Sequence, residues 1–428
     1  MVGVLWCVAL LALVVVSVLR TSQLDLVLAK HHGDDVQARF LALAGVEKAK
    51  ALLAAELRQS KRAARGPSSA LEDSPAQFQD VALGRGRFSV RHRDPERSVW
   101  RYGITDESAR LDLNVAPTNE LIRIPGLTLD IAAAIVDWRD GDNAVGTGGA
   151  EVEYYSSLQP PHMVRNGPFQ TVRELLMVRG VTPVLLSGRD RTRRGDVPSG
   201  TPGDTGWEDL LTAHSVSAET SVNGEDRVNV QTADEKTLAA VRGFTPEIAK
   251  AIVARRGQNP IATLLDLLDV PAAPAPGRAG PGGGPGDRGG GDPGGPKVIS
   301  ETLLQDVADS LATGDGDGAR GIGLVNVNTA GLAVLSCLPG VEPTLAQTII
   351  SRRASAGPFA HPIALLKVDG MDRERLKALL PRITTRSETY RIHAEGTVPG
   401  RGNRRHIETV VRATATGFTT LAYREDDL

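Results

Sequence analysis

A pattern of nine positions occurs three times in this chain, and it constrains the fold more than any other feature. The second copy lies 117 residues after the first, and the third lies 214 residues after the first. The first copy consists of Asn114, Ala116, Leu121, Pro125, Gly126, Leu127, Ala132, Ile135 and Arg139, the second of Gln231, Ala233, Leu238, Arg242, Gly243, Phe244, Ala249, Ile252 and Arg256, and the third of Asn328, Ala330, Leu335, Pro339, Gly340, Val341, Ala346, Ile349 and Arg353. Matches at so many fixed offsets predict three homologous structural units.

Each copy has the pattern of a helix-hairpin-helix unit. Apolar residues at helical spacing flank a turn in which Gly126, Gly243 or Gly340 permits a backbone conformation that other residues resist. We expect the Asn or Thr near the Ala of the pattern to cap the first helix. A second Gly hairpin follows Gly167 in the first copy and Gly357 in the third. The middle copy keeps only the remnant NPIATLLDLL before a linker.

That linker, residues 271–296, consists almost wholly of Pro, Gly and Ala with a few Asp and Arg. Such a composition buries too little apolar surface to offset the entropy of ordering the chain. We therefore predict that the linker is disordered.

The N-terminus carries an uncharged apolar run from Val2 through Trp6 to Leu19, which Arg20 ends. As a helix this run spans about 27 Å, enough for a short membrane crossing. A cleaved signal peptide is the alternative, but the run has no basic segment before it and no Ala-x-Ala site after it. Because no proline occurs before Pro67, we predict one continuous helix, which begins in the membrane and becomes amphipathic outside it.

Two regions of alternating apolar and polar residues lie on either side of the repeats. One begins at Gly86 and the other at Thr389, and each has the pattern of strands joined by turns. We expect them to pair into one sheet on the N-terminal helix. The predicted fold class is α+β, in which a pilin-like long N-terminal helix packs on an antiparallel sheet and a large inserted α-helical region holds the helix-hairpin-helix (SAM-like) units.

This organisation predicts eight segments. They are the membrane and pilin helix (1–65), a first β part (66–113), helical unit 1 (114–190), a loop (191–226), helical unit 2 (227–270), the disordered linker (271–298), helical unit 3 (299–384) and the C-terminal strands (385–428).

The loop after the first repeat is the candidate site of the chain. Its carboxylates lie in a Gly-rich context, at Asp137, Asp140, Asp142, Glu151 and Glu153. Clustered carboxylates on a loop suit a hard cation such as Ca²⁺, which takes six to eight oxygen ligands. The spacing is not that of an EF-hand, so a solvated acidic loop remains the alternative.

Catalysis and nucleic-acid binding have little support in the sequence. No Ser/His/Asp or Cys/His arrangement, phosphate loop or dinucleotide fingerprint occurs, so we expect no enzyme and no cofactor other than Ca²⁺. The hairpins read PGLTLD, RGFTPE and PGVEPT, without the second Gly of DNA-binding hairpins and with an acid after each turn. Because the net charge is −2 as well, we expect no nucleic-acid partner.

With these residues in view, the chain resembles the minor pseudopilin K family of type II secretion systems. The apolar run VLWCVALLALVVVSV and the following ARFLALAGVEKAKALL are similar to the N-terminal helix of that family. The most specific block is AIVDWRDGDN…GAEVEYY…RNGPFQTVRELLMVRGVTP, which is similar to the family's inserted helical domain. The segments VNVNTAGLAVLSCLPGV and HAEGTV…IETVVR extend the likeness toward the C-terminus.

The resemblance implies a subunit at the tip of a short pseudopilus, with calcium in its inserted domain. It implies other minor pseudopilins and inner-membrane secretion components as partners. The N-terminal helix would then lie in the inner (cytoplasmic) membrane as a single pass, with the soluble part in the periplasm. The alternative function is a membrane-tethered helix-hairpin-helix protein of DNA uptake.

The chain departs from the family pattern in two places. The middle unit and its linker are extra, and the basic leader ending in Gly does not precede the apolar run. We expect that leader to be encoded upstream of Met1.

Overall fold

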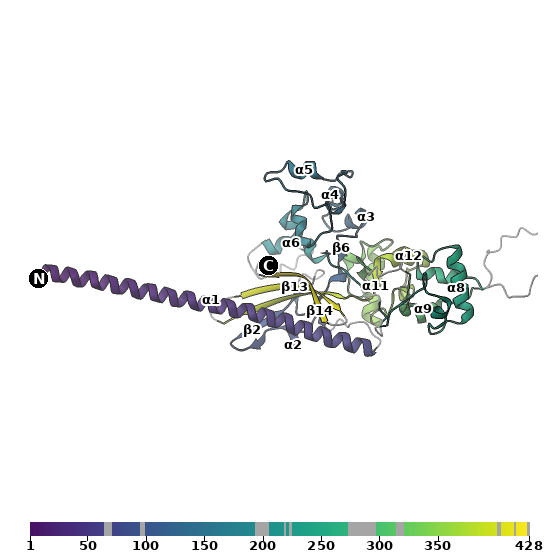
Figure 1. Cartoon of the computed structure of the whole chain (residues 1–428), viewed down its shortest axis with the longest axis horizontal. Coiled ribbons are helices and arrows are strands. Elements are labelled where there is room, and N and C mark those ends of the chain that lie inside the picture. Colours follow the sequence, from purple (N-terminus) through teal and green to yellow (C-terminus); the bar gives the residue numbers. More distant parts are fainter. Residues whose placement is uncertain are drawn as a thin grey trace, which may run out of the picture.

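The computed structural model of the chain describes residues 1–63, 71–94, 99–192, 205–217, 220–221, 225–272, 297–313, 321–399, 404–414 and 417–425. The predicted disorder of the linker concerns residues 273–296, which lie outside these residues. Within the described residues, one long helix, one six-stranded sheet, four two-stranded sheets and a set of short helices make up the molecule (Figure 1).

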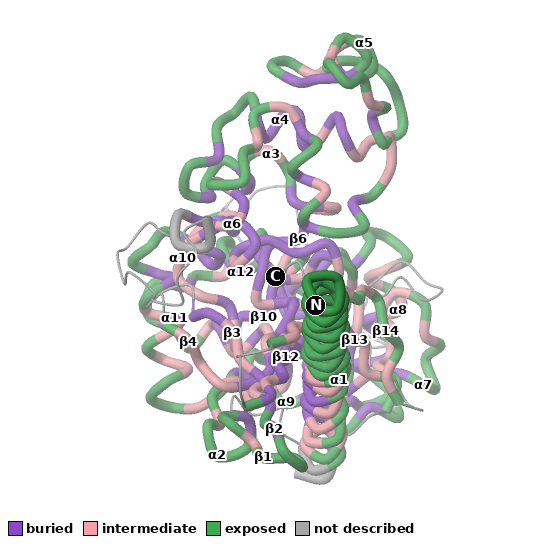
Figure 2. The backbone as a smooth tube through the Cα atoms, turned by 90° about the vertical axis from the view of Figure 1, so that its left-hand side faces the viewer, coloured by how far each residue is buried: buried purple, intermediate pink, exposed green. Residues whose placement is uncertain are grey.

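Helix α1 (Val2–Ala63) is continuous, as its sequence predicts. Its N-terminal half projects from the rest of the molecule and is exposed along its whole length, whereas its second half lies on the sheet (Figure 2). The buried residues of the second half recur at helical spacing, at Ala38, Leu41, Ala42, Val46, Ala49 and Leu53. The stripe from Ala42 onward forms the main core of the body with residues of the sheet such as Val90 and Ile392, and Ala38 and Leu41 form a smaller cluster with Phe88 and Val398.

The sheet has the order β1-β2-β12-β13-β14, all antiparallel, and β5 also pairs with β12. Its strands are β1 (Val81–Leu83), β2 (Gly86–Val90), β5 (Thr105–Asp106), β12 (Thr389–Thr397), β13 (Arg404–Thr414) and β14 (Gly417–Glu425). Strands from before and after the insertion therefore share one sheet on α1, and the predicted α+β pilin-like fold is confirmed. We call α1 from Ala38 onward, together with this sheet, the body.

Gly396 of β12 allows the helix and the sheet to approach closely. A Cβ at this position would overlap the carbonyl oxygen of Ala38 and lie 2.5 Å from the backbone nitrogen of Ala42. Because both atoms belong to the backbone of α1, no side-chain movement could relieve the overlap.

The region from Gly86 onward contains more strands than its sequence pattern of strands joined by turns indicates, and these strands belong to different sheets. Strands β3 (His92–Arg93) and β4 (Trp100–Arg101) pair with each other as a separate two-stranded sheet, and α2 (Pro75–Phe78) packs beside β2. After β5 come the short helix η2 (Glu107–Ala109) and β6 (Leu111–Asp112). Strand β6 pairs in parallel with β7 (Leu211–Thr212), so Leu111 and Asp112 belong to the inserted region, not to the first β part.

The three repeats fold as three units of one design. In each unit a short strand precedes two helical hairpins, and a second short strand closes the unit by pairing in parallel with the first. Unit 1 contains β6, α3 (Thr118–Leu121), α4 (Leu129–Arg139), α5 (Val152–Ser156), η3 (Val172–Met177), α6 (Pro183–Thr192), η4 (Trp207–Asp209) and β7. Unit 3 contains β10 (Val325–Asn326), α10 (Leu332–Leu335), α11 (Pro343–Ala356), η7 (Pro362–Lys367), α12 (Arg373–Leu379), η8 (Leu380–Arg382) and β11 (Ile383–Thr384).

Unit 2 is complete, which corrects the prediction that it keeps only a remnant of its second hairpin. It contains β8 (Val228–Asn229), α7 (Glu235–Ala239), α8 (Pro246–Gln258), η5 (Leu264–Asp269), α9 (Glu301–Val307), η6 (Ala308–Ser310) and β9 (Leu311–Ala312). The predicted boundary at 299 assigned α9 and β9 to unit 3, but β9 pairs with β8 and α9 contacts η5. Pro271 and Lys297 pair at the base of the linker, which is therefore an insertion within the second hairpin of unit 2.

The Asn or Gln that opens each repeat joins the two hairpins of its unit. The Asn328 amide donates to the carbonyl oxygens of Phe359 (2.9 Å) and Thr385 (3.0 Å), and its oxygen accepts from the N–H of Phe359 (2.8 Å). Asn114 makes the same pair of contacts with Phe169, and Gln231 accepts from the N–H of Ile261. The prediction that an Asn or Thr near the Ala caps the first helix is wrong. Asn114 and Asn328 bond to the start of the second hairpin, and the N-cap positions are Pro117, Asp234 and Gly331.

The Arg that ends each repeat returns to the start of its unit. Arg256 donates to the carbonyl oxygen of Val230 (2.9 Å), and Arg353 donates to that of Val327 (2.6 Å). Arg139 makes the equivalent contact with Leu113. In each unit, an arginine near the end of the second helix thus donates to a backbone carbonyl oxygen next to the first strand and gives that oxygen a hydrogen-bond partner.

The units share one continuous hydrophobic core. Polar contacts also join the units to one another and to the body. Arg382 of unit 3 makes two hydrogen bonds, of 2.9 and 2.7 Å, to Glu120 of unit 1. Asp309 of unit 2 accepts from Arg386 at 3.0 Å, and Asp106 of the body accepts from Asn326 of unit 3 at 2.8 Å. Unit 2, with α8 and α9, lies at the end of the molecule opposite the N-terminus (Figure 1).

Candidate functional site

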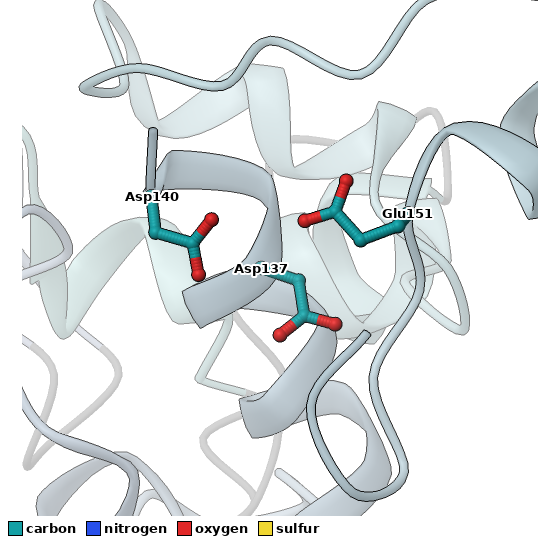
Figure 3. A group of neighbouring side chains, drawn as sticks. All are labelled: Asp137, Asp140 and Glu151. Atoms are coloured by element: carbon teal, nitrogen blue, oxygen red, sulfur yellow. The ribbon is translucent and has the colours of Figure 1, made fainter. Parts of the chain in front are cut away.

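The acidic loop of unit 1 gathers three of its five predicted carboxylates. Asp137 lies in the last turn of α4, Asp140 directly follows that helix, and Glu151 directly precedes α5. One carboxylate oxygen from each lies within 4.8 Å of the others. Figure 3 shows the three side chains side by side, brought together by the return of the loop between α4 and α5.

Burial makes this cluster unusual. Asp137 is 3% exposed and Glu151 is 2% exposed. Both oxygens of Glu151 and one oxygen of Asp140 are buried without a hydrogen-bond partner. Because a buried carboxylate oxygen without a donor costs free energy, these atoms require a proton or a cation.

Electrostatics leads to the same conclusion. Burial raises the pKa of Glu151, and the negative charges of Asp140 and Asp137 raise it further. Burial also raises the pKa of Asp137, although the N–H of Gly146 opposes this by donating to its carboxylate at 3.1 Å. Three carboxylates that repel one another in a buried space are an arrangement that a divalent cation would stabilise.

Two glycines make room for the Asp137 carboxylate. A Cβ on Gly149 would overlap Oδ2 of Asp137, and a Cβ on Gly146 would lie 2.7 Å from Oδ1. The sequence showed the Gly-rich context but not these roles, since they depend on how the loop returns to α4. The residues present therefore fit a hard cation, because three side chains bring carboxylate oxygens together in a buried place.

Asp142 and Glu153 do not join the cluster. Asp142 is exposed, and its carboxylate accepts from the N–H of Ala144 (2.7 Å). Glu153 is exposed in α5, two residues after Glu151. Side chains two positions apart at the start of a helix point in different directions. Glu151 faces the cluster, and Glu153 therefore does not.

The predicted membrane residues lie on the free part of α1. Val2, Trp6 and Leu19 are 71%, 68% and 57% exposed. Within the described residues, α1 is the one helix long and apolar enough to cross a membrane. A single-pass anchor is compatible with this helix.

The predicted hairpin glycines adopt the left-handed backbone that their sequence suggested. Gly126, Gly243 and Gly340 have φ of 78°, 92° and 70°. Each hairpin, with Pro125 or Pro339 before its Gly in units 1 and 3, faces the second hairpin of its own unit. The nearest atoms to a Cβ on the three glycines belong to Leu185, Leu303 and Arg375, at 3.6, 3.0 and 3.8 Å.

In units 1 and 3 the glycine of the second hairpin also faces a residue of the first hairpin. Gly180, with φ of 82°, faces Ile131 of α4, and Gly370, with φ of 85°, faces Leu345 of α11. The two hairpins of a unit therefore pack reciprocally, and the hairpin turns contribute to the internal packing of the units.

Comparisons with known proteins match different parts of the chain. A family model described as "Type II secretion system (T2SS), protein K" matches residues 117–188, which hold most of unit 1 with the acidic cluster. A second model, "Helix-hairpin-helix motif", matches residues 223–273 and 321–384, in units 2 and 3.

Curated relatives match part of the chain. The "Endonuclease/exonuclease/phosphatase family domain-containing protein 1" of Bos taurus is 28% identical over 167 residues, and that of Homo sapiens is 27% identical over 164 residues. Each match covers 37% of this chain. The chain spans only 25% of the length of these relatives.

A solved structure is similar over most of the chain at low identity. It is "The Crystal Structure of the GspK-GspI-GspJ complex from enterotoxigenic Escherichia coli Type 2 Secretion System", with a TM-score of 0.42 and 12% identity over 94% of this chain and 99% of that one. The solved structure is similar only at low identity, whereas the protein K model matches the sequence of unit 1 itself. It confirms the resemblance that the sequence predicts: in its inserted unit 1 this chain is similar to protein K of the type II secretion system.

Proposed function

We propose that this protein is a minor pseudopilin-like subunit at the tip of a type II secretion pseudopilus, where it acts in assembly and protein secretion. The observation that carries the proposal is the combination of a protein K unit with a body in which a long helix extends far beyond its sheet. The role requires no catalytic activity from the chain.

The free half of α1 supports a role in assembly. Between Val2 and Leu28 the helix exposes large apolar side chains on all sides. Such a surface is stable only in a lipid bilayer or against apolar helices of other subunits. We infer that the helix anchors the subunit in the inner membrane, with the body in the periplasm, and later packs against minor pseudopilins and inner-membrane secretion components.

The position of the inserted units supports placement at a tip. Units 1 to 3 lie beside and beyond the C-terminal end of α1, away from its free half (Figure 1). A subunit added above this one along the helix axis would meet these units. We infer that the chain ends a filament and does not continue it.

A complementation experiment tests the proposal. In a strain that lacks this protein, the full-length chain should restore secretion, and Leu10→Arg in the apolar run should abolish it and remove the protein from the membrane fraction. Gln258→Arg, on the exposed end of α8, is the matched control and should secrete normally. Normal secretion by the Leu10→Arg protein in the soluble fraction would contradict the proposal.

Co-purification tests the partners. The full-length chain in detergent should retain the minor pseudopilins expressed with it, and Leu10→Arg should lose them. Membrane-bound wild-type protein that retains no pseudopilin would contradict an assembly role.

We also propose that Asp137, Asp140 and Glu151 hold a calcium ion. Bound calcium would supply positive charge to the buried carboxylates and fix the loop between α4 and α5. Melting of the full-length chain should occur at a higher temperature with calcium than with chelator, and Asp137→Asn should abolish the difference. Asp142→Asn is the control, and an equal loss in this variant would contradict the three-residue site.

DNA binding in uptake is the alternative, because the helix-hairpin-helix model matches units 2 and 3. The hairpins give it little support. Thr128 and Thr245 already accept hydrogen bonds from the N-termini of α4 and α8, and Glu342 places an acid at that of α11. Binding of a short DNA duplex by the full-length chain, with micromolar and salt-sensitive affinity, would favour the alternative.

A further inference from the structure

A small, partly open cavity lies where α1, the body and unit 3 meet. Its volume is about 40 Å³. Its polar lining comes from three carboxylates, Glu56 of α1, Glu72 and Asp106, and from the first residues of unit 3, including Asn326 and Thr329. Such a cavity is large enough for about one water molecule.

Asp106 makes the contact between the body and unit 3. It is 5% exposed, and its Oδ2 accepts from the Asn326 amide (2.8 Å) and the Thr329 hydroxyl (2.7 Å). Its Oδ1 accepts from the N–H of Ser108 (2.8 Å). These uncharged donors lower the pKa of Asp106, but burial outweighs them and raises it, so a proton can lie on either Asp106 or Glu72.

Glu72 is held on the other side of the cavity by its backbone. The N–H of Ile104 donates to the carbonyl oxygen of Leu71 (2.8 Å), and that of Ser74 donates to Tyr102 (2.7 Å). A Cβ on Gly103 would overlap the carbonyl oxygens of Leu71 and Glu72. The backbone around Glu72 is therefore packed directly against the segment that leads into β5. This packing keeps Glu72 beside the cavity.

Charged groups from four elements face Glu72. Asp106 of β5 and Glu56 of α1 are negative, whereas Arg353 of α11 and Arg101 of β4 are positive. Both arginines have other partners: Arg353 donates to Val327, and Arg101 donates to Asp94 at 2.8 Å. Burial and the charge of Asp106 prevail, and they raise the pKa of Glu72 to about 7.

We propose that Glu72 and Asp106 form a proton-sensitive joint, which holds unit 3 against the body while one of the two carboxyl groups is protonated and loosens when both are charged. Two carboxylates beside one small cavity repel each other strongly when both are ionised. Separation of unit 3 from the body relieves this repulsion because water then enters the cavity. The proposal concerns the coupling of unit 3 to α1 and does not depend on the secretion role.

The sign of the pH effect follows from linkage. The pKa of Glu72 is near 7 in the closed joint and about 4.3 in an open, hydrated one. The contribution of Glu72 to closure is therefore fully present below about pH 4 and is lost as the pH rises through 7. Between about pH 6 and about pH 8 the equilibrium should shift toward the open joint by about tenfold.

Hydrogen exchange on the full-length chain in detergent tests the joint. The N–H of Val327, which bonds to Thr384 within unit 3, reports unfolding of the unit, whereas the side-chain amide of Asn326, which donates to Asp106 across the joint, reports its opening. In the wild-type protein the protection factor of the Asn326 side-chain amide should fall by about tenfold from about pH 6 to about pH 8, and that of the Val327 N–H should not change. In Glu72→Gln the protection of the Asn326 side-chain amide should be the same at both pH values.

Glu374→Gln, an exposed glutamate of α12, is the matched control and should behave like the wild type. Unchanged protection of the Asn326 side-chain amide in the wild type, or the same fall in Glu72→Gln, would overturn the proposal. If Glu72→Gln does not fold, carboxyl ¹³C titration of glutamate-labelled Glu151→Gln protein decides, because the pKa of Glu151 is raised as well. A glutamate that titrates near pH 7 is expected, and titration of all glutamates below about pH 5.5 would overturn the joint.

Discussion

The carboxylate of Glu107 is fully buried and accepts two hydrogen bonds from Arg391, at 2.5 and 3.2 Å. Arg391 lies in the central strand β12 of the body, 284 residues away in the sequence. Glu107 also accepts from Arg110 (2.6 Å) and from the hydroxyl of Thr212 in β7. One buried carboxylate thus connects the sheet to unit 1 at the point where the insertion begins and returns.

Replacement of Glu107 by Ala should strongly destabilise the protein. The substitution leaves Arg391 and Arg110 buried together with the more distant Glu408, 3.9 Å from Arg391, in place of the close counter-charge, so the free energy of unfolding should fall by about 3–5 kcal/mol. Urea denaturation followed by circular dichroism measures this change. The exposed Glu374→Ala should stay within about 0.5 kcal/mol of the wild type. A Glu107→Ala loss as small as that of Glu374→Ala would show that the pair does not hold unit 1 to the sheet.

His92 of β3 should make the stability depend on pH. Burial lowers its pKa to about 4, and the charges of Arg110 and Arg101 act in the same direction. Its folded pKa lies below its unfolded value of about 6.5, so its contribution is present above pH 6.5 and lost as the pH falls toward 4. The melting temperature of His92→Gln should therefore fall less than that of the wild type over this interval. Parallel pH profiles for the two proteins would rule out a buried neutral His92.

Asn328 should contribute more to the free energy of unfolding than an exposed Asn does. Its side chain makes three hydrogen bonds to the backbone of Phe359 and Thr385, and Asn328→Ala would leave those groups without partners. We expect a loss of about 2–3 kcal/mol in the free energy of unfolding. Asn259→Ala, at the exposed end of α8, should cost much less, and equal losses in a denaturant titration would refute the role of Asn328 in joining the hairpins.

Gly149 should be required for the acidic cluster. Gly149→Ala would place a methyl group against Oδ2 of Asp137, so the loop must move and the calcium-dependent rise in melting temperature should shrink. Gly141→Ala is the matched control in the same loop, because no atom lies within 4 Å of its Cβ position. Isothermal titration with calcium measures the affinity directly. Equal calcium affinity in both variants would place the ion elsewhere.

The sequence alone determined the elements whose signal is local or periodic. The repeat at offsets of 117 and 214 predicted three units because homologous positions must fill the same core, as Ala132, Ala249 and Ala346 do at 0% exposure. The apolar run and its amphipathic continuation predicted α1, and alternation predicted strands that pair across the insertion. The left-handed hairpin glycines also followed from the sequence, since only glycine adopts that backbone freely.

Only the tertiary structure decided which distant residues meet. It completed unit 2 with α9 across the linker, because the parallel pairing of Val228 with Leu311 depends on residues 83 positions apart. It selected Asp137, Asp140 and Glu151 from five similar carboxylates, and it turned Asn328 from a predicted helix cap into a link between hairpins. In each case the local pattern allowed several partners, and the choice among them came from the direction in which a side chain leaves its folded backbone.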